Sequence, residues 1–383
     1  MLRGLTPAES FLTGIRINHI GDIRGDVDEG LLAKAVDAVA ATRSALRASR
    51  GLLVRDSSLA DELAVPLGPE ETFRATLLPG TFVLTVEHSI ADGRAALALF
   101  RAILETYTAL AEGMEVPVLP PDHGRSALDG LRHWSEADVA AHIEHRRATA
   151  ADVPRVPFDH LPEGGLDLRR LLFAPELTGR LATRAKAEGA SLHGLIAAAL
   201  LLAARAEIGP VPGPLGLVST VDLRSRLVPP MAPDALTHCS SWFIDSVEVA
   251  EDSDPFELAR GIRRRLRAAL DTGYPELEML ALETVVRDPG FSNLVTVNLT
   301  NLGRVTSPRL PRGLELTDWS SYMSSAVDRW NPDAPHGVLP AGVFTVDGRL
   351  DITIRFQSHC FGPQRIERIL DHVRETLTRG ATC

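Results

Sequence analysis

The chain has 383 residues, of which 45% are hydrophobic and 23% are charged, and its formal net charge is -10 at pH 7. This composition supports one large or two medium-sized folded domains with a sizeable core, and it excludes a disordered protein. Binding to nucleic-acid phosphates needs a basic face, so the acidic balance argues against a nucleic-acid partner.

The sequence offers no signal for export, membrane insertion or oxidative cross-linking. Residues Met1–Leu12 lack the long apolar stretch of a signal peptide. The most apolar segment, Leu195–Ala204, is well short of the roughly 20 residues that span a bilayer, so it predicts a buried helix. Neither a metal site nor a disulfide framework fits the spacing of Cys239, Cys360 and Cys383. A reducing cytoplasm is the expected location.

The first part of the chain alternates between helical and strand patterns. Apolar residues recur at helical spacing in Asp28–Leu46. Strands are expected at Gly51–Val54, Thr72–Leu78 and Thr81–His88. Alternation in the last strand places His88 on one face and Glu87 on the other. Helical spacing resumes after Asp92 and Gly93, so Glu87–Gly93 is expected to form a strand-to-helix loop, where functional side chains are often presented.

Prolines punctuate the region from Val116 to Leu166, in which a helix is expected at Ala137–Ala148. We interpret Val153–Gly165 as an interdomain linker, which divides the chain into subdomains at residues 1–165 and 166–383. Later helices are expected at Pro175–Glu188, at Leu192–Ala206 with Ser191 as its N-cap, and at Gly362–Thr378. Later strands are expected at Leu215–Val221, Ser241–Val249, Asn293–Leu299 and in an Asp347-Gly348 hairpin joining Gly342–Val346 to Leu350–Phe356. This alternation predicts an α/β or α+β fold.

The segment with the clearest chemistry is His88-x-x-x-Asp92-Gly93. Imidazole has a pKa near working pH, so His88 at a strand end could accept a proton from an attacking hydroxyl or amine. Asp92 is better placed to hold the loop by pairing with an arginine than to act in a triad, and Gly93 permits a tight bend. The same string also fits a loop histidine followed by an ordinary turn.

The segment Glu87-His88-Ser89-Ile90-Ala91-Asp92-Gly93 resembles the His-His-x-x-x-Asp-Gly signature of the chloramphenicol-acetyltransferase-like superfamily. That superfamily includes condensation domains, polyketide-associated acyltransferases and alcohol acetyltransferases. Further phrases follow in the order of condensation-type enzymes, and this order makes the resemblance specific. They are Leu5-Thr6-Pro7-Ala8-Glu9, Gly25–Asp28 through Leu46-Arg47-Ala48, Ser191–Gly194 through Leu200, Val221-Asp222-Leu223-Arg224, and Val297–Arg304.

The resemblance implies two chloramphenicol-acetyltransferase-like subdomains in a V-shaped pseudo-dimer, with the active site in a tunnel at their interface. It implies an acyltransferase whose donor is a thioester, either acyl-CoA or the phosphopantetheine arm of a carrier protein, and whose acceptor is an alcohol or amine. Such an enzyme would act in secondary-metabolite or lipid biosynthesis as a monomer, with no metal and no permanently bound cofactor.

The resemblance also implies roles for single residues. His88 maps onto the catalytic base, and Arg224 onto the ion-pair partner of Asp92 that holds the catalytic loop, although Arg224 also fits an exposed surface position. Gly93 would keep the donor channel clear. A second set could donate a hydrogen bond to the reaction's oxyanion, or could satisfy backbone groups at a strand end: Asn298, Thr300 and Asn301. Two further residues align with a strand that lines the tunnel in relatives, Ser240 and Trp242. Trp242 also fits a position in the packed core.

Two features depart from the superfamily pattern. Glu87 stands where most members have the first of two histidines, and its position on the opposite face from His88 predicts an effect on packing or loop geometry. The Asp-Phe-Gly-Trp-Gly motif of the plant enzymes is absent, which argues against that branch. Two alternatives to acyl transfer stay open: a catalytically silent domain that docks carrier proteins, and the same fold catalysing cyclisation or isomerisation.

Other motifs carry less information. His142 and His145 are three apart on an expected helix, but without a nearby carboxylate pair or cysteine they are a weak zinc signal. The sequence has no nucleophile elbow, no Walker phosphate loop and no dinucleotide-binding glycine motif, which argues against the usual hydrolase, nucleotide and dinucleotide functions.

Overall fold

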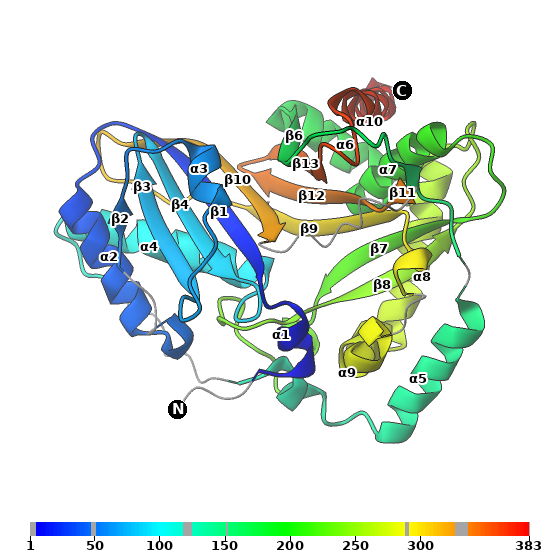
Figure 1. The fold of residues 1–383 in the computed structure, drawn as a ribbon, viewed down its shortest axis with the longest axis horizontal. Helices are drawn as coiled ribbons and strands as arrows, with labels where there is room; N and C mark the ends of the chain where they lie inside the picture. Colours follow the sequence, from blue (N-terminus) through cyan, green and yellow to red (C-terminus); the bar gives the residue numbers. More distant parts are fainter. Residues whose placement is uncertain are drawn as a thin grey trace. The chain divides into compact units, whose positions relative to one another are not determined.

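The computed structural model describes residues 5–46, 51–117, 125–150, 152–287, 291–325 and 336–382. The chain forms two compact units, each built on a β-sheet with helices packed on it (Figure 1). Unit 1 comprises Met1–His133, Asp222–Ser240 and Thr306–Arg329, and unit 2 comprises Trp134–Val221, Ser241–Val305 and Trp330–Cys383. The predicted mixture of helices and strands is confirmed.

Unit 1 is built on a five-stranded sheet in the order β10-β1-β4-β3-β2. Every pairing in it is antiparallel except that of β2 with β3. The strands are β1 (Ile15–Arg24), β2 (Leu53–Val54), β3 (Phe73–Leu78), β4 (Thr81–Glu87) and β10 (Glu315–Ser325). The helices are α1 (Pro7–Phe11), α2 (Glu29–Ala41), α3 (Leu59–Ala64) and α4 (Gly93–Ala111), with 3-10 turns at Ser44–Leu46, Ala127–Leu131 and Arg224–Arg226.

Helix α4 packs on the sheet of unit 1 through aromatic rings. Phe82 of β4 stacks on Phe100 of α4 with 5.5 Å between ring centroids, and Phe100 stacks on Trp319 of β10 at 5.0 Å. All three side chains are fully buried. Because burial of such rings stabilises the contact between strand and helix, the short loop that joins β4 to α4 has a rigid element at each end.

Unit 2 is built on a six-stranded sheet in the order β6-β13-β12-β9-β7-β8. Strands β7, β9 and β12 are parallel to one another, whereas β12, β13 and β6 pair antiparallel. The strands are β6 (Leu166–Phe173), β7 (Leu215–Asp222), β8 (Ser240–Val247), β9 (Val297–Val305), β12 (Leu339–Val346) and β13 (Arg349–Gln357), and β5 (Val156–Pro157) pairs with β11 (His336–Gly337). The helices are α5 (Glu136–Thr149), α6 (Pro175–Ala187), α7 (Leu192–Ile208), α8 (Pro255–Asp271), α9 (Tyr274–Arg287) and α10 (Pro363–Thr382), with a 3-10 turn at Phe291–Leu294.

Helix α7 lies in the core of unit 2. Every residue from Gly194 to Arg205 is buried, which confirms the buried helix predicted from Leu195–Ala204. Ser191 caps the helix, as predicted, by accepting a hydrogen bond from the Gly194 N–H at 3.0 Å. Within the described ranges, no helix by itself has the length and apolarity to cross a membrane; α6 and α7 pass that test together but are bent by 98°.

The predicted hairpin is confirmed, and its turn residues Asp347 and Gly348 have the positive φ values, 49° and 83°, that a two-residue hairpin turn favours. The predicted strand at Asn293–Leu299 is partly wrong, because its first residues form a 3-10 turn and the strand runs on to Val305. Elements absent from the prediction include β1, β6, β10, α8 and α9. Strand β1 lacks the alternation of apolar and polar residues that predicts a strand, because polar Arg16, Asn18 and His19 are buried along it.

The two units do not coincide with the predicted division at residue 165. The chain enters unit 2 at Trp134, and two later segments return to unit 1. One supplies β10, which pairs with β1, and the other, Asp222–Ser240, packs around Asp92. A boundary drawn from composition cannot detect such returns, because they depend on long-range strand pairing. The V-shaped pairing and the tunnel stay predictions; Arg47, Ala48 and Cys383 lie outside the described residues.

Helix α5 is attached to unit 2 by polar contacts. Its only buried side chains are His142 and Arg146. Arg146 Nη1 donates to Glu278 Oε1 of α9 at 2.5 Å, and the Tyr274 hydroxyl donates to the same oxygen at 2.9 Å. The ring of His142 packs edge-on against Tyr274 at 4.7 Å, whereas His145 is exposed. Glu278 therefore holds α5 in place.

We predict that Glu278→Ala lowers the free energy of unfolding by about 3 kcal/mol, because it leaves the buried Arg146 guanidinium without its counter-charge. Chemical denaturation measures this loss, and hydrogen exchange of the α5 amides should accelerate. Glu144→Ala, which removes an exposed pair with Arg147, is the control and should cost no more than about 0.5 kcal/mol. Equal effects of the two substitutions would contradict the assignment.

Candidate functional site

His88 directly follows β4, in the loop that leads to α4. Its backbone N–H donates to the carbonyl of Ile15 at 2.8 Å, and the residue is 8% exposed. Its Nδ1 lies 2.9 Å from the carbonyl oxygen of Ala91. A carbonyl can only accept, so Nδ1 carries the proton in the neutral ring and the lone pair lies on Nε2. The loop therefore sets Nε2 as the atom that can accept a proton.

Asp92 anchors the other end of this loop. It is the N-cap of α4 and accepts a hydrogen bond from the Ala95 N–H at 2.9 Å. Its Oδ2 accepts from Arg224 Nη1 at 2.7 Å and from the Cys239 backbone N–H at 2.9 Å, and its Oδ1 accepts from Arg224 Nη2 at 3.0 Å. The residue is 2% exposed. These donors replace the hydration that a buried carboxylate loses. Gly93, next along the chain, is the first residue of α4.

Arg224 is as deeply buried as Asp92, so its place is not on the surface. It also donates to Asp222 Oδ1 at 3.0 Å and to the carbonyls of Ala235 and Thr237 at 3.2 and 3.1 Å. Burial by itself would raise the pKa of Asp92, but the charge and hydrogen bonds of Arg224 outweigh it and hold that pKa below its usual value. Both groups are therefore ionised, and the pair fixes the start of α4 to the segment Asp222–Ser240.

His238 is a second histidine at this site, and the sequence does not single it out. Its ring centroid lies 5.5 Å from that of His88, at an interplanar angle of 61°, and the residue is 4% exposed. Its Nε2 is 3.0 Å from the hydroxyl oxygen of Ser240. The one available signal is its position two residues before Ser240, since only folding brings residues 88 and 238 together. His88, Asp92, Arg224, His238 and Ser240 all belong to unit 1.

Glu87 takes part in loop geometry. Its Oε1 accepts a hydrogen bond from the Gly14 N–H at 2.7 Å, at a point where Gly14 has a φ of 82° just before β1. Burial raises the pKa of Glu87, while that hydrogen bond and the charge of Arg16 oppose the rise. The carboxylate thus ties the α1–β1 connection to the end of β4.

The remaining predicted residues lie in unit 2. Asn298, Thr300 and Asn301 are on β9, and Trp242 is on β8. Asn301 Oδ1 accepts from the Gly303 N–H at 2.8 Å, which turns its Nδ2 toward Nδ1 of His193 at 3.5 Å. Thr300 pairs its hydroxyl with that of Thr220 at 3.2 Å. Their roles toward a substrate stay predictions.

His193, which no sequence motif singles out, adds to this polar group. Its Nε2 lies 3.1 Å from the hydroxyl oxygen of Ser219 on β7. Because Asn301 Nδ2 donates to Nδ1, the Nε2 of His193 carries the proton and donates to Ser219. Burial lowers the pKa of His193 to about 4, so the ring is neutral at pH 7.

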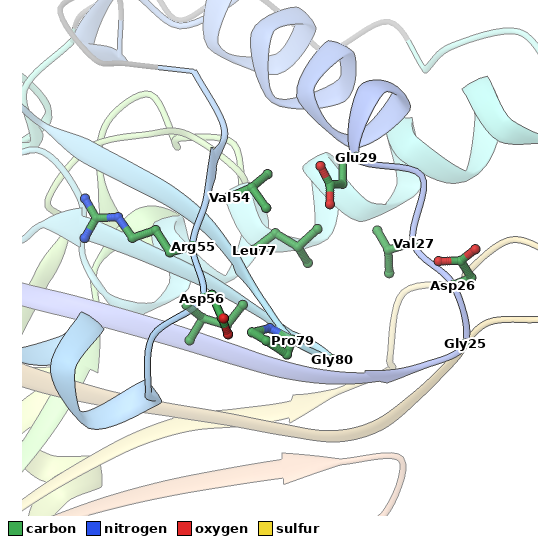
Figure 2. A pocket seen from close by; sticks show the side chains of 11 residues that line it. Gly25, Asp26, Val27, Glu29, Val54, Arg55, Asp56, Leu77, Pro79 and Gly80 are labelled. Carbon is green, nitrogen blue, oxygen red and sulfur yellow. The ribbon is translucent and has the colours of Figure 1, made fainter.

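A cavity of about 350 Å³ lies elsewhere in unit 1 (Figure 2). It is lined by the segment that leads into α2 and the first residue of that helix, by residues around β2 and by the β3–β4 turn, including Asp26, Glu29, Val54 and Pro79. That turn is at the opposite end of β4 from His88. The cavity therefore does not belong to the His88 site. Within the described ranges, no group of three or more His, Cys, Asp or Glu side chains is placed to hold a metal ion.

Comparison with solved structures supports the fold. The structure of polyketide synthase associated protein 5 from Mycobacterium tuberculosis has a TM-score of 0.78 and 22% sequence identity, and the match covers 97% of each chain. Trichothecene 15-O-acetyltransferase from Fusarium sporotrichioides has a TM-score of 0.74 at 12% identity, and the match covers 99% of this chain and 94% of that one. At these identities the likeness shows the fold.

Comparison of sequences adds the family. Phthiocerol/phthiodiolone dimycocerosyl transferase of Mycobacterium ulcerans is 26% identical over 330 residues, which are 79% of this chain and 79% of the relative. A family model described as the C-terminus of phthiocerol/phthiodiolone dimycocerosyl transferase matches residues 162–355, just over half of the chain. The superfamily predicted from the sequence is thereby confirmed. The chain belongs to the phthiocerol/phthiodiolone dimycocerosyl transferase family, within the acyltransferases that share the condensation-domain fold.

Proposed function

We propose that this protein transfers an acyl group from a thioester to an alcohol or amine, with His88 as the general base. Family membership and the named relatives support an acyltransferase of lipid or secondary-metabolite biosynthesis, the class predicted from the sequence. The observation that carries the role of His88 is its tautomer, because the Ala91 carbonyl places the lone pair on Nε2.

The proposed step needs no acyl-enzyme intermediate. His88 Nε2 removes the proton from the acceptor hydroxyl or amine as that oxygen or nitrogen attacks the thioester carbonyl carbon. The carbonyl electrons move onto oxygen and then return as the carbon–sulfur bond breaks. The imidazolium gives its proton to the departing thiolate, which restores neutral His88. Holding the two substrates in line supplies much of the rate.

The donor and acceptor are proposed at the level of chemical class. The donor is acyl-CoA or an acyl group on the phosphopantetheine arm of a carrier protein, and no permanently bound cofactor is required. The named relatives are dimycocerosyl transferases, which favours a lipid acyl group. A reducing cytoplasm is proposed as the location, on the cysteine spacing in the sequence.

Asn298, Thr300 and Asn301 remain the candidates for a hydrogen bond to the developing oxyanion, and Trp242 for a wall of the substrate site. The amide of Asn301 is already held by Gly303 and His193, so its orientation is preorganised.

A silent platform that docks carrier proteins is the second candidate function. The feature that favours it is Glu87 in place of the first signature histidine. Against it, the Glu87 carboxylate is bonded to the Gly14 backbone, so this replacement alters the loop support and leaves the His88 ring set as a base.

We predict that His88→Ala lowers turnover about a thousandfold, because general base catalysis contributes roughly 10²- to 10⁴-fold. Thiol release from a panel of acyl-CoA and carrier-bound acyl donors, with short-chain and long-chain alcohols and amines as acceptors, measures the loss. His145→Ala, at an exposed position on α5, is the control and should keep full activity. Unchanged turnover in His88→Ala would exclude the base role, and no thiol release by the unmodified protein would favour the platform.

We predict that Arg224→Ala lowers the free energy of unfolding by at least about 3 kcal/mol at pH 7, because it leaves the Asp92 carboxylate buried without a counter-charge. Activity should fall as well, since the loop that holds His88 loses its anchor. Urea unfolding and the thiol-release assay measure the two effects. Arg94→Ala, which removes a half-exposed arginine 3.4 Å from Asp222, should cost less than about 1 kcal/mol.

The cost of Arg224→Ala should depend on pH with a definite sign. In the unmodified protein the pKa of Asp92 is depressed, so its contribution to stability is present above the unfolded value, roughly 3.9, and is lost below it. In the variant, burial is no longer opposed by Arg224 and raises the pKa of Asp92. As the pH falls, Asp92 is therefore protonated in the variant before it is protonated in the unmodified protein, and protonation removes the cost of the buried, unpaired charge. The difference in unfolding free energy should therefore shrink as the pH falls from 7 toward 4. A pH-independent difference would contradict this account.

A further inference from the structure

Two buried histidines face each other at the proposed active site. The rings of His88 and His238 are 5.5 Å apart between centroids and meet edge to face. Each ring has its own anchor, the Ala91 carbonyl for His88 and the Ser240 hydroxyl for His238. Less than a tenth of either residue is exposed. The pair therefore has a defined geometry with little access for water.

Such a pair holds one proton more readily than two. Two imidazolium ions at this distance repel each other strongly where water cannot screen them. The charged and titratable groups acting on His238 are His88 and Asp92 from the loop before α4, Glu9 from α1, and Arg224 from the turn after β7. Burial, and then the charge of His88, lower the pKa of His238 to about 4. His238 is therefore neutral at pH 7.

We propose that His238 is a positioning residue for His88, whose neutral ring walls off one side of the His88 imidazole and keeps it in the unprotonated form that acts as a base. This inference rests on the proposed function. The Ser240 hydroxyl fixes the plane of the His238 ring, and the adjacent Cys239 N–H bond to Asp92 fixes its backbone. The segment that anchors the loop thus also shapes the surroundings of the base.

A direct consequence concerns the protonation of His88. Removing the His238 ring lets water reach the imidazolium form and stabilises it, so the pKa of His88 rises. Coupling between two titrating groups is reciprocal in sign. Removing His88 therefore raises the pKa of His238, because the charge that opposes its protonation is gone.

Histidine NMR titration tests this coupling without any substrate. We compare the unmodified protein with His88→Ala, His238→Ala and His238→Phe, and the spectra of the first two variants assign the resonances. In His238→Ala the His88 midpoint should rise by about one pH unit. In His238→Phe, which keeps a ring in place, it should stay within about 0.3 of the original value. In His88→Ala the His238 midpoint should rise. Midpoints that do not move in either alanine variant would overturn the proposal.

The pH dependence of kcat/KM provides the second readout, using whichever donor and acceptor support thiol release. The acid limb of His238→Ala should move upward by about one pH unit, a tenfold loss on that limb with the same plateau at high pH. A lowered plateau with an unmoved limb would indicate a structural role and would overturn the proposal. If the unmodified protein transfers no acyl group while the NMR midpoints shift as expected, the proposed function fails and the histidine coupling stands.

Discussion

The Asp92 carboxylate is the constraint on which the site of unit 1 depends. Burying a charge is costly, and here the cost is offset by two guanidinium hydrogen bonds, one backbone N–H from the segment Asp222–Ser240 and one from the first turn of α4. One side chain therefore joins the start of α4 to the segment Asp222–Ser240, which is far away in the sequence. Because all four donors point at the same two oxygens, the start of α4 has little freedom to move.

The chemistry of His88 follows from this anchoring. The loop between β4 and α4 is only five residues long, so its ends fix the position of the Ala91 carbonyl between them. That carbonyl determines which nitrogen of His88 carries the proton, and hence which one can act as a base. Electrostatic contacts at Asp92 thus determine a tautomer four residues earlier, with no direct contact between the two side chains required.

Glu87 shows what the departure from the family signature does in the structure. In a strand, adjacent side chains point to opposite faces, so the side chain of Glu87 is directed away from that of His88. Here the Glu87 carboxylate accepts a hydrogen bond from the Gly14 backbone N–H. With a histidine at this position, only an unprotonated imidazole nitrogen could accept that hydrogen bond. The replacement supports the connection between α1 and β1. A residue in the signature can therefore change type while the neighbouring His88 keeps its contact with the Ala91 carbonyl.

The sequence by itself determined the superfamily, the buried helix α7, the strand-to-helix loop that carries His88 and the pairing of Asp92 with Arg224. These depend on local periodicity or on short phrases in a fixed order, which are readable along the chain. Only the tertiary structure placed β10 beside β1, moved the division of the chain away from residue 165 and set His238 against His88. The strand pairing and the histidine pair each join segments more than a hundred residues apart. The buried polar residues of β1 also prevent a hydrophobic pattern from identifying that strand. Long-range pairing and the burial of compensated charge are properties of the folded chain, and no local window of residues contains them.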